Sequence, residues 1–346
     1  MDRGRKSERL RKKISGRLAP QTMEVSPRFT DCTFSVIDME TTGLANDDRV
    51  LEIAIVRFSG DGKHFDQWTT LVNPARDLGA TDIHEVRDFL EVKHAPRFED
   101  IAGDIADRIQ GTVLVAHNAA FDVRFLLKEF KRIGVDLPEL PTLCTLRLGC
   151  KLGAHSRGLL ACCTQFGIPI GNAHRALDDA QSAARLLALY LMCCQTNGLG
   201  TLSDLGCTAP LLKAWPPVPR PTRDPIVHRP TGVRHHNAYL SRLVARLPDE
   251  GEPEVVEYLG LLDRALEDFQ VSLAEAEALQ LHAKENGLTN KVGELNASYL
   301  EALIVSAWED AVLTAEELEQ LQLVATLLGF APEHLSALIA KHNPHL

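Results

Sequence analysis

The sequence predicts an α/β domain with a mixed β-sheet, followed by a small all-α domain. Three observations support this division. Between residues 34 and 195, strand-like runs are followed by alternating helical and strand-like patterns. A stretch rich in proline then interrupts the chain. Beyond it only helical patterns occur, and they repeat with a period of 42 residues.

The strand patterns come first. Three runs of apolar, β-branched and aromatic residues read FSVIDME, EIAIVRF and WTTLVNP, and the last one ends at a proline. A fourth run, TVLVAH, is almost wholly apolar, which is typical of a strand buried on both faces. We therefore predict strands at residues 34–40, 52–58, 68–74 and 112–117.

Helical periodicity separates and follows these strands. Ile101, Ile105 and Ile109 recur every four residues, which predicts an amphipathic helix over residues 98–109. A second helix is predicted from Phe121 to Ile133, where Gly134 ends it, and a long third one within residues 174–194.

Charge divides the chain into four parts. The net charge of −10 combines +6 for residues 1–29, −7 for 30–205, +6 for 206–248 and −15 for 249–346. Seven prolines lie between Pro210 and Pro230 and favour an extended linker. We predict a basic flexible tail (1–29), an α/β domain (30–205), a proline-rich basic linker (206–237) and an all-α domain (238–346).

The all-α region contains two similar helical hairpins. Each copy begins with a capping box, at Ser272–Glu275 and at Thr314–Glu317. Each first helix ends at a glycine, Gly287 or Gly329. The pattern loosely resembles the TerB-like helical fold of tellurium-resistance proteins.

Several classes of protein are disfavoured. The apolar runs are too short to span a bilayer, and the charged N-terminus does not resemble a signal peptide, so we expect no membrane association and a cytoplasmic protein. The eight cysteines include no CxxC spacing, which argues against a zinc site and favours buried free thiols.

The first chemical signal is the pair Asp38 and Glu40. Two residues apart on a strand, both carboxylates project from the same face. They repel one another unless a cation, most simply a divalent metal ion, neutralises them. A lone pair of this kind is more often two solvated acids at a strand end, so further acidic residues are needed to support a site.

Two later segments supply them. Asp122 lies where the strand at residues 112–117 leads into a helix. His174 lies at or just before the start of another helix, and Asp179 follows five residues later, in its second turn. This spacing lets Asp179 face the sheet with His174 near the same cleft.

These segments resemble the DEDDh 3′→5′ exonuclease family, the proofreading type typified by the epsilon subunit of bacterial DNA polymerase III. The resemblance covers about residues 33–195 and rests on DMETTGL (38–44), HNAAFD (117–122) and HRALDD (174–179). It implies a ribonuclease-H-like fold with a five-stranded mixed sheet.

The resemblance also implies the chemistry. Asp38, Glu40, Asp122 and Asp179 are expected to hold two Mg²⁺ or Mn²⁺ ions. His174 is expected to be the general base that takes a proton from the attacking water. The product implied is a nucleoside 5′-monophosphate.

Substrate contacts follow from the same resemblance. Leu44 and Phe121 match positions that pack on the terminal base, and Gly43 lies beside them. Thr41, Asn118 and His84 match positions near the terminal sugar or phosphate. His84 stands in IHEV, where the family commonly has a glycine after the histidine, so an ordinary surface histidine is an equal alternative.

Three functions remain open at this point. The first is a DNA exonuclease of repair or proofreading, acting at a DNA 3′ end. The second is an RNA 3′-trimming exonuclease of the same superfamily, because the metal site does not distinguish the two sugars. The third is a non-catalytic scaffold that works through its acidic helical domain. No clamp-binding peptide supports attachment to a replicative polymerase.

The acidic all-α domain is expected not to bind nucleic acid, since its charge repels a polyanion. We expect it to be separable from catalysis and to contact a protein partner with a basic surface or the chain's own linker arginines. In the second case it competes with nucleic acid for them and is mildly inhibitory. Those arginines are Arg220, Arg223, Arg229 and Arg234.

Overall fold

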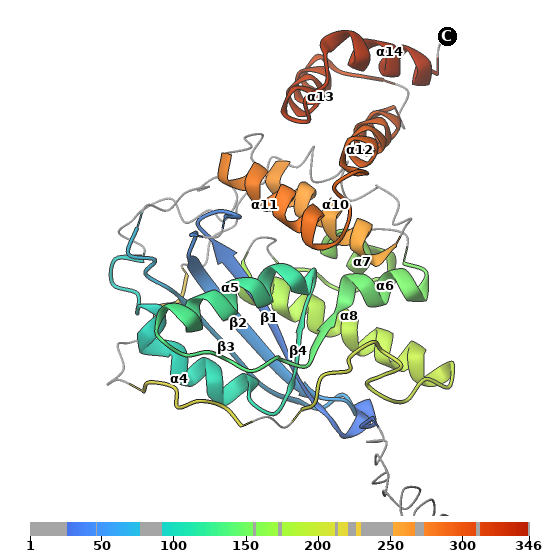
Figure 1. Ribbon diagram of the computed structural model, residues 1–346. Coiled ribbons are helices and arrows are strands. Elements are labelled where there is room, and N and C mark those ends of the chain that lie inside the picture. The colour runs from blue at the N-terminus through green and yellow to red at the C-terminus, as the bar shows by residue number, and fades with distance from the viewer. Residues whose placement is uncertain are drawn as a thin grey trace, which may run out of the picture.

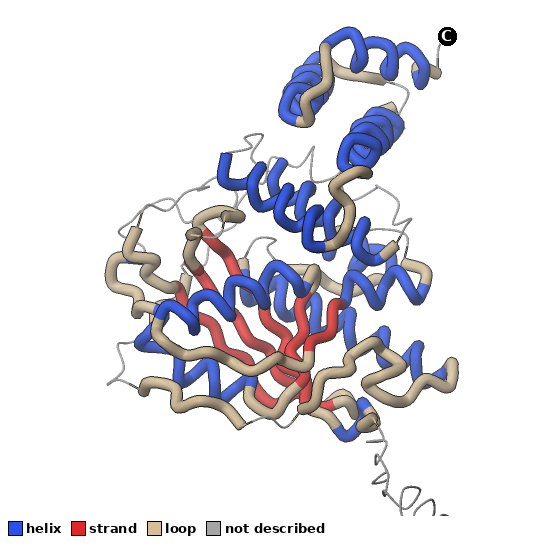
Figure 2. Tube along the Cα trace, in the orientation of Figure 1, coloured by secondary structure: helices blue, strands red, loops and turns tan. Residues whose placement is uncertain are grey.

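The computed structural model describes residues 26–45, 47–76, 92–154, 157–171, 175–211, 214–220, 226–229, 252–266, 273–308 and 312–344. The chain forms an α/β domain with a group of helices packed on one end of it (Figures 1 and 2). Both predicted fold classes are therefore confirmed, while the boundaries between the four predicted parts stay predictions.

The α/β domain is built on a five-stranded mixed sheet with strand order β3-β2-β1-β4-β5. Strands β1, β2 and β3 pair antiparallel, whereas β4 lies parallel to β1 and β5 parallel to β4. Four strands agree with the sequence patterns, and the short β5 was not recognised. The strands are β1 (Thr33–Thr41), β2 (Val50–Ser59), β3 (His64–Leu71), β4 (Val113–Ala116) and β5 (Thr142–Cys144).

Helices cover both faces of this sheet, as the alternation of side chains in β1 requires. Phe34 and Val36 belong to the core formed with α8 (Ala176–Thr196), whereas Ile37 and Met39 belong to the core formed with α4 (Phe98–Ile109) and α5 (Ala119–Arg132). All three long helices agree with the predicted patterns. Two shorter helices, α6 (Thr145–Leu152) and α7 (Leu159–Gln165), were not recognised.

The end of the predicted tail packs on the domain. Arg28 forms a β-bridge with Thr201, and the Phe29 side chain is 1% exposed. A short 3-10 helix, η1 (Phe29–Asp31), leads into β1. Residues 26–29 therefore belong structurally to the α/β domain, and residues 1–25 lie outside the described residues.

The described part of the proline-rich linker follows the surface of the α/β domain. The Leu71 amide donates to the Val227 carbonyl (2.8 Å). Arg220 forms an ion pair with Asp107, and Arg229 one with Glu52. The partners described for Arg220 and Arg229 are carboxylates of the α/β domain, and the expectation that the linker arginines pair with the acidic helices stays a prediction. Arg223 and Arg234 lie outside the described residues.

The C-terminal helices are α10 (Pro253–Leu266), α11 (Leu273–Glu285), α12 (Val292–Ala307), α13 (Ala315–Leu327) and α14 (Pro332–His342). The 42-residue repeat corresponds to the pairs α11–α12 and α13–α14. The capping box at Thr314 and Glu317 is present, and Gly287 and Gly329 have positive φ, as predicted. Ser272 lies outside the described residues, and the TerB-like resemblance stays a prediction.

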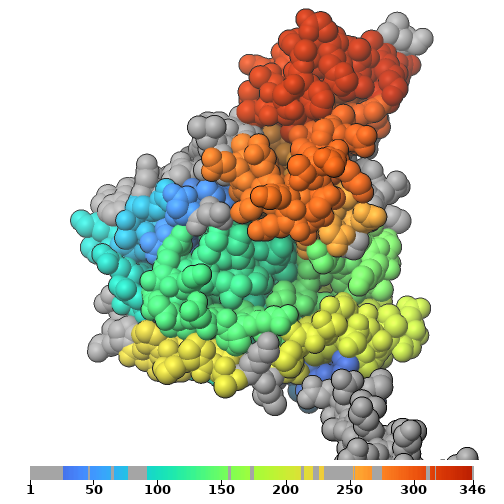
Figure 3. Space-filling model, in the orientation of Figure 1, coloured from blue at the N-terminus to red at the C-terminus, as the bar shows by residue number. Residues whose placement is uncertain are grey.

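Helix α10, which precedes the repeat, packs on the α/β domain. Its Val256 and Leu261 share one apolar core with Leu44, Phe121 and Leu146. Figure 3 shows the orange helices seated on the upper end of the α/β domain. The C-terminal helices thus extend the core of the α/β domain at the end where β1 finishes (Figure 1).

None of the eight cysteines forms a disulfide, and six of them are buried, as expected. Among the described helices, none combines the length and the apolar character that a membrane span requires.

Glu129 ties α5 to the start of β2. Its carboxylate is 1% exposed and accepts hydrogen bonds from Arg49 Nε (2.7 Å), the Val50 amide (3.3 Å) and Arg132 Nη1 (2.9 Å). We expect Glu129→Ala to lower the free energy of unfolding by about 2–3 kcal/mol, because buried donors lose their acceptor. Urea unfolding followed by circular dichroism measures this.

Lys63→Ala is the matched control, since Lys63 is 79% exposed in its pair with Asp61 and should change the stability by less than about 1 kcal/mol. Equal stabilities of Glu129→Ala and the wild type would show that these bonds do not hold the helix to the sheet.

Candidate active site

Strand β1 carries the first two carboxylates. Asp38 and Glu40 project from the same face as Phe34 and Val36, toward α8, and Met39 points to the opposite face, where it is fully buried. Both acids are 6% exposed. The simple alternative of two solvated acids at a strand end is therefore wrong, because the structure shields both from water.

Asp122 reaches the same place from the first turn of α5. Its Oδ1 accepts a hydrogen bond from the Met39 amide (3.1 Å). The parallel pairing of β1 with β4 runs only from Phe34 to Val36. The Asp122 carboxylate therefore accepts a hydrogen bond from a β1 amide that lies beyond the end of this pairing. The Asp122 side chain is completely buried.

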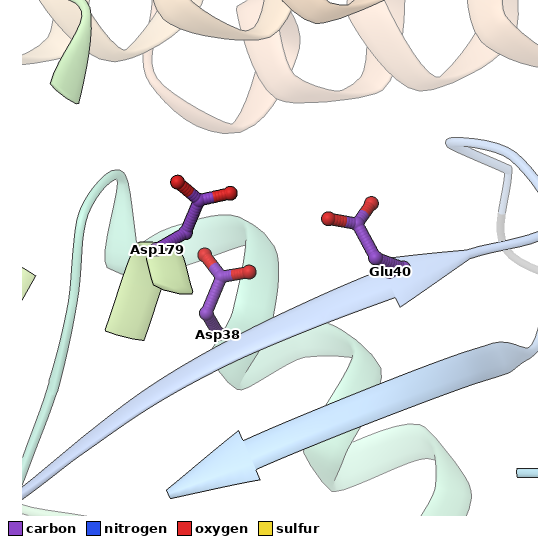
Figure 4. Close-up of side chains that lie close together, drawn as sticks. All are labelled: Asp38, Glu40 and Asp179. Carbon is purple, nitrogen blue, oxygen red and sulfur yellow. The ribbon is translucent and has the colours of Figure 1, made fainter. Parts of the chain in front are cut away.

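Asp179 completes the cluster from α8. Carboxylate oxygens of Asp38, Glu40 and Asp179 all lie within 4.8 Å of one another. Figure 4 shows the three side chains pointing into one space, with helices of the C-terminal part on its far side. Residues 141 positions apart in the chain, Asp38 and Asp179, thus meet at one end of the sheet.

The donor set fits a hard divalent cation. Every ligand offered is a carboxylate oxygen, the type that Mg²⁺ and Mn²⁺ prefer. Asp38 Oδ2 and Asp122 Oδ2 are buried atoms for which the described residues provide no hydrogen-bond partner. Such orphaned acceptors are uncommon in native proteins, and a bound cation satisfies them.

The predicted base-contacting residues lie next to the carboxylates and are covered. Leu44 is 6% exposed and Phe121 4% exposed. Phe121 packs on Phe125 with ring centroids 4.8 Å apart. Thr41 lies at the end of β1 and donates its hydroxyl to the Gly43 carbonyl (2.8 Å).

Gly43 and Asn118 each show a backbone constraint. A Cβ at Gly43 would lie 2.5 Å from Asp48 Oδ2, so close approach of the Asp48 side chain, rather than a positive φ, requires glycine there. Asn118 precedes α5 in the left-handed conformation, with φ 65°. Asparagine tolerates this conformation better than most residues, and such strain is typical of functional sites.

His174 and His84 lie outside the described residues, so their predicted roles stay predictions. His117, in the second motif, is half-buried, and its nitrogens contact Thr145 Oγ1 (3.0 Å) and the Arg157 carbonyl (2.6 Å). Burial lowers its pKa to about 4. His117 is therefore neutral at pH 7 and fully engaged in the fold.

Comparison with known proteins agrees with this geometry. Residues 35–187 match the family model described as Exonuclease. The chain is 38% identical over 165 residues to the DNA polymerase III subunit epsilon of Treponema pallidum, covering 46% of this chain and 76% of that protein. The chain belongs to the DEDDh exonuclease family. Residues 35–187 thus form its exonuclease domain.

Other relatives match the same domain. The PolC-type DNA polymerase III of Thermotoga maritima is 32% identical over 184 residues, which are 51% of this chain and 13% of that polymerase. The chain therefore spans only a small part of the PolC-type relatives. A solved structure titled exonuclease X in complex with 5′ overhanging duplex DNA is 28% identical, with a TM-score of 0.39, over 50% of this chain and 96% of that one.

Burial and mutual repulsion raise the pKa values of two acids in this cluster, Asp38 and Asp122. Burial, followed by the charges of Asp179, Asp122 and Glu40, raises the pKa of Asp38 well above its usual value. Burial raises the pKa of Asp122 to about 7. Arg264 of α10 acts in the opposite direction on both acids.

Arg264 and Glu52 were not anticipated from the sequence, and Arg229 was expected only as a linker arginine. Glu52 in β2 is opposite Glu40 and accepts from the Ala176 amide (3.4 Å) at the start of α8, the helix that carries Asp179. Burial raises its pKa to about 7, although Arg229 at 3.2 Å opposes this shift. A signal for Glu52 existed, because it is an acidic residue in a mostly apolar strand, whereas Arg264 carried no such signal.

The raised pKa of Asp122, which burial causes, predicts how stability depends on pH. Folded Asp122 holds its proton up to a pKa of about 7, whereas its ordinary pKa is 3.8, so the metal-free protein should lose stability as pH rises through this interval. Mg²⁺ should restore the melting temperature at about pH 7.5 and do little at about pH 5. Thermal unfolding in EDTA and in Mg²⁺ measures both effects.

Asp122→Asn should reduce the pH-dependent loss and the response to Mg²⁺. The exposed acid Asp47, with 85% of its side chain accessible, gives the control Asp47→Asn, which should behave as wild type. A metal-free protein that becomes more stable over the whole interval contradicts this description of the site.

Proposed function

We propose that the chain is a metal-dependent 3′→5′ exonuclease that hydrolyses nucleic acid, preferably DNA, from its 3′ end to nucleoside 5′-monophosphates. The observation that carries the proposal is the cluster of Asp38, Glu40 and Asp179, with Asp122 buried behind it. Three buried carboxylates gathered with the half-buried one of Asp179 serve no packing purpose, and all four match the acidic residues of the family motifs.

The carboxylates hold the cofactor in this proposal. Asp38, Glu40, Asp122 and Asp179 bind two Mg²⁺ or Mn²⁺ ions, for which their oxygens are the appropriate ligands. When bound, such ions supply the positive charge that fixes a phosphate and lowers the pKa of an attacking water. The sheet and α8 keep the carboxylates in place before substrate arrives, so little reorganisation accompanies the reaction.

The remaining site residues orient the substrate and move the proton. His174 takes the proton from the attacking water, and its ordinary pKa near 6.5 suits this role at neutral pH. Phe121 and Leu44 offer apolar surface for the terminal base. Thr41 and Asn118 offer polar groups for the terminal sugar or phosphate, with Gly43 between the strand end and Leu44. His84 is a further candidate for this contact.

DNA is the favoured substrate because the relatives reported above are named as DNA polymerase III components. A role in replication proofreading or DNA repair follows from the same likeness. An RNA-trimming activity is the alternative result of the test below.

Matched 3′-tailed DNA and RNA oligonucleotides, labelled at the 5′ end, test the proposal in Mg²⁺ and in Mn²⁺. We expect a ladder of products shortened from the 3′ end, with release of nucleoside 5′-monophosphates and faster cleavage of DNA. Asp38→Ala should lower the rate by at least about 10²–10³-fold, since charge stabilisation of that size is lost. Near-wild-type cleavage by Asp38→Ala would overturn the metal assignment.

His174→Ala separates proton transfer from metal binding. The rate should fall by about 10²–10⁴-fold, the usual contribution of a general base, while Mn²⁺ affinity stays close to that of the wild type. Isothermal titration with Mn²⁺ measures the second quantity. A loss of Mn²⁺ affinity as large as that of Asp38→Ala would make His174 a ligand instead of a base.

A further inference from the structure

Helix α10 lies over the surface that the proposed substrate would occupy. The Arg264 guanidinium carbon is 4.2 Å from the centroid of the Phe121 ring, in the position of a stacked group. Phe121 and Leu44 are 4% and 6% exposed, and both share their core with apolar residues of α10. A terminal base cannot stack on Phe121 while Arg264 covers it.

The backbone of α10 also lies close to the side chain of Asn118. A Cβ added at Gly260 would lie 3.2 Å from Asn118 Nδ2 and 3.5 Å from Leu146 Cδ2. Even a residue as small as alanine at position 260 would crowd the asparagine. No room for a sugar or a phosphate exists at this contact between α10 and the start of α5.

Two ion pairs fasten α10 to the exonuclease domain. Glu257 lies 2.5 Å from Arg147, and the carboxylate side chain is 5% exposed. Asp263 lies 3.4 Å from Arg157, with exposed fractions of 11% and 4%. The acidic groups of α10 thus occupy arginines beside the site in the way that substrate phosphates would.

Positive charge continues beyond these pairs. A groove of about 1040 Å³ runs beside α10, between α5 and α6 on one side and α11 on the other. Its lining includes Asn118, Phe121 and four cationic side chains of the exonuclease domain: Arg124, Lys128, Arg147 and Lys151. Glu257 of α10 also lines this groove, so an acid of α10 lies among cations that suit a polyanion.

We propose that α10 is an autoinhibitory element that closes the active site, and that nucleic acid must displace it to reach the carboxylates. The inference rests on the proposed exonuclease function. In the closed state Arg264 lies over Phe121, and Glu257 and Asp263 hold Arg147 and Arg157. In the open state a strand takes the same aromatic ring and the same arginines.

A reversible disulfide between α10 and α6 tests the proposal in the full chain. A Cβ at position 260 would contact the end of the Leu146 side chain (3.5 Å to Cδ2), so the variant Leu146→Cys/Gly260→Cys places two thiols at this contact, and loss of free thiols after oxidation measures the crosslink. We expect the oxidised form to cleave a 3′-tailed DNA oligonucleotide at least about tenfold more slowly than the reduced form, because the open fraction is removed. Reductant should restore the rate.

The reduced double variant is the control for the effect of the substitutions. Each single variant, treated with the same oxidant, is the control for oxidation of the eight native cysteines. A phosphorothioate-ended oligonucleotide should also slow disulfide formation, since it competes with α10. Equal cleavage by oxidised and reduced protein overturns the autoinhibition. Absence of cleavage in the wild type and in every reduced variant instead refutes the exonuclease function, and the inference with it.

Variants that remove a charge from α10 test, without a crosslink, whether a weaker closed state raises the rate of cleavage. Glu257→Gln weakens the pair with Arg147 and leaves the exonuclease domain unchanged, so it should raise cleavage at subsaturating DNA by about threefold to tenfold. Glu301→Gln is the matched control, because Glu301 pairs with Lys341 inside the C-terminal helices. A rate for Glu257→Gln no higher than that of Glu301→Gln contradicts the proposal.

Discussion

Mutual repulsion among buried carboxylates is the constraint on which this structure depends. Asp38, Glu40 and Asp122 are each at most 6% exposed, and Asp179 joins them from another helix. Water cannot screen these charges effectively, so each acid raises the free energy of its neighbours' ionised forms. Several features of the fold can be understood as ways of holding this arrangement together: the bond from the Met39 amide to Asp122, the Glu52 contact with the start of α8, and the cation of Arg264.

The chemistry at the strand ends was predictable from local rules. Alternation along β1 places Asp38 and Glu40 on one face, and the strand-to-helix junction after β4 brings Asp122 beside them. The three long helices of the exonuclease domain also followed from periodicity. The strand β5 escaped prediction because three residues, Thr142–Cys144, are too few to show a pattern, and its pairing with β4 is what makes it a strand.

The position of α10 was not predictable, for a physical reason. Net charge suggested that the acidic C-terminal part does not itself bind nucleic acid and contacts a protein partner with a basic surface or the linker arginines. The contacts are instead decided by single side chains. Arg264 is one of only four Lys or Arg residues in residues 249–346, yet it lies over Phe121. Glu257 and Asp263 find Arg147 and Arg157, which lie in helices and turns that periodicity did not identify as a docking surface.

A crystal structure of the full chain grown with Mn²⁺ would show directly whether the four carboxylates hold the metal, because anomalous scattering locates manganese independently of the protein atoms. We expect manganese within coordination distance of carboxylate oxygens of Asp38, Glu40, Asp122 and Asp179. Manganese bound elsewhere, with these four carboxylates protonated or paired only with arginine, would contradict this metal assignment.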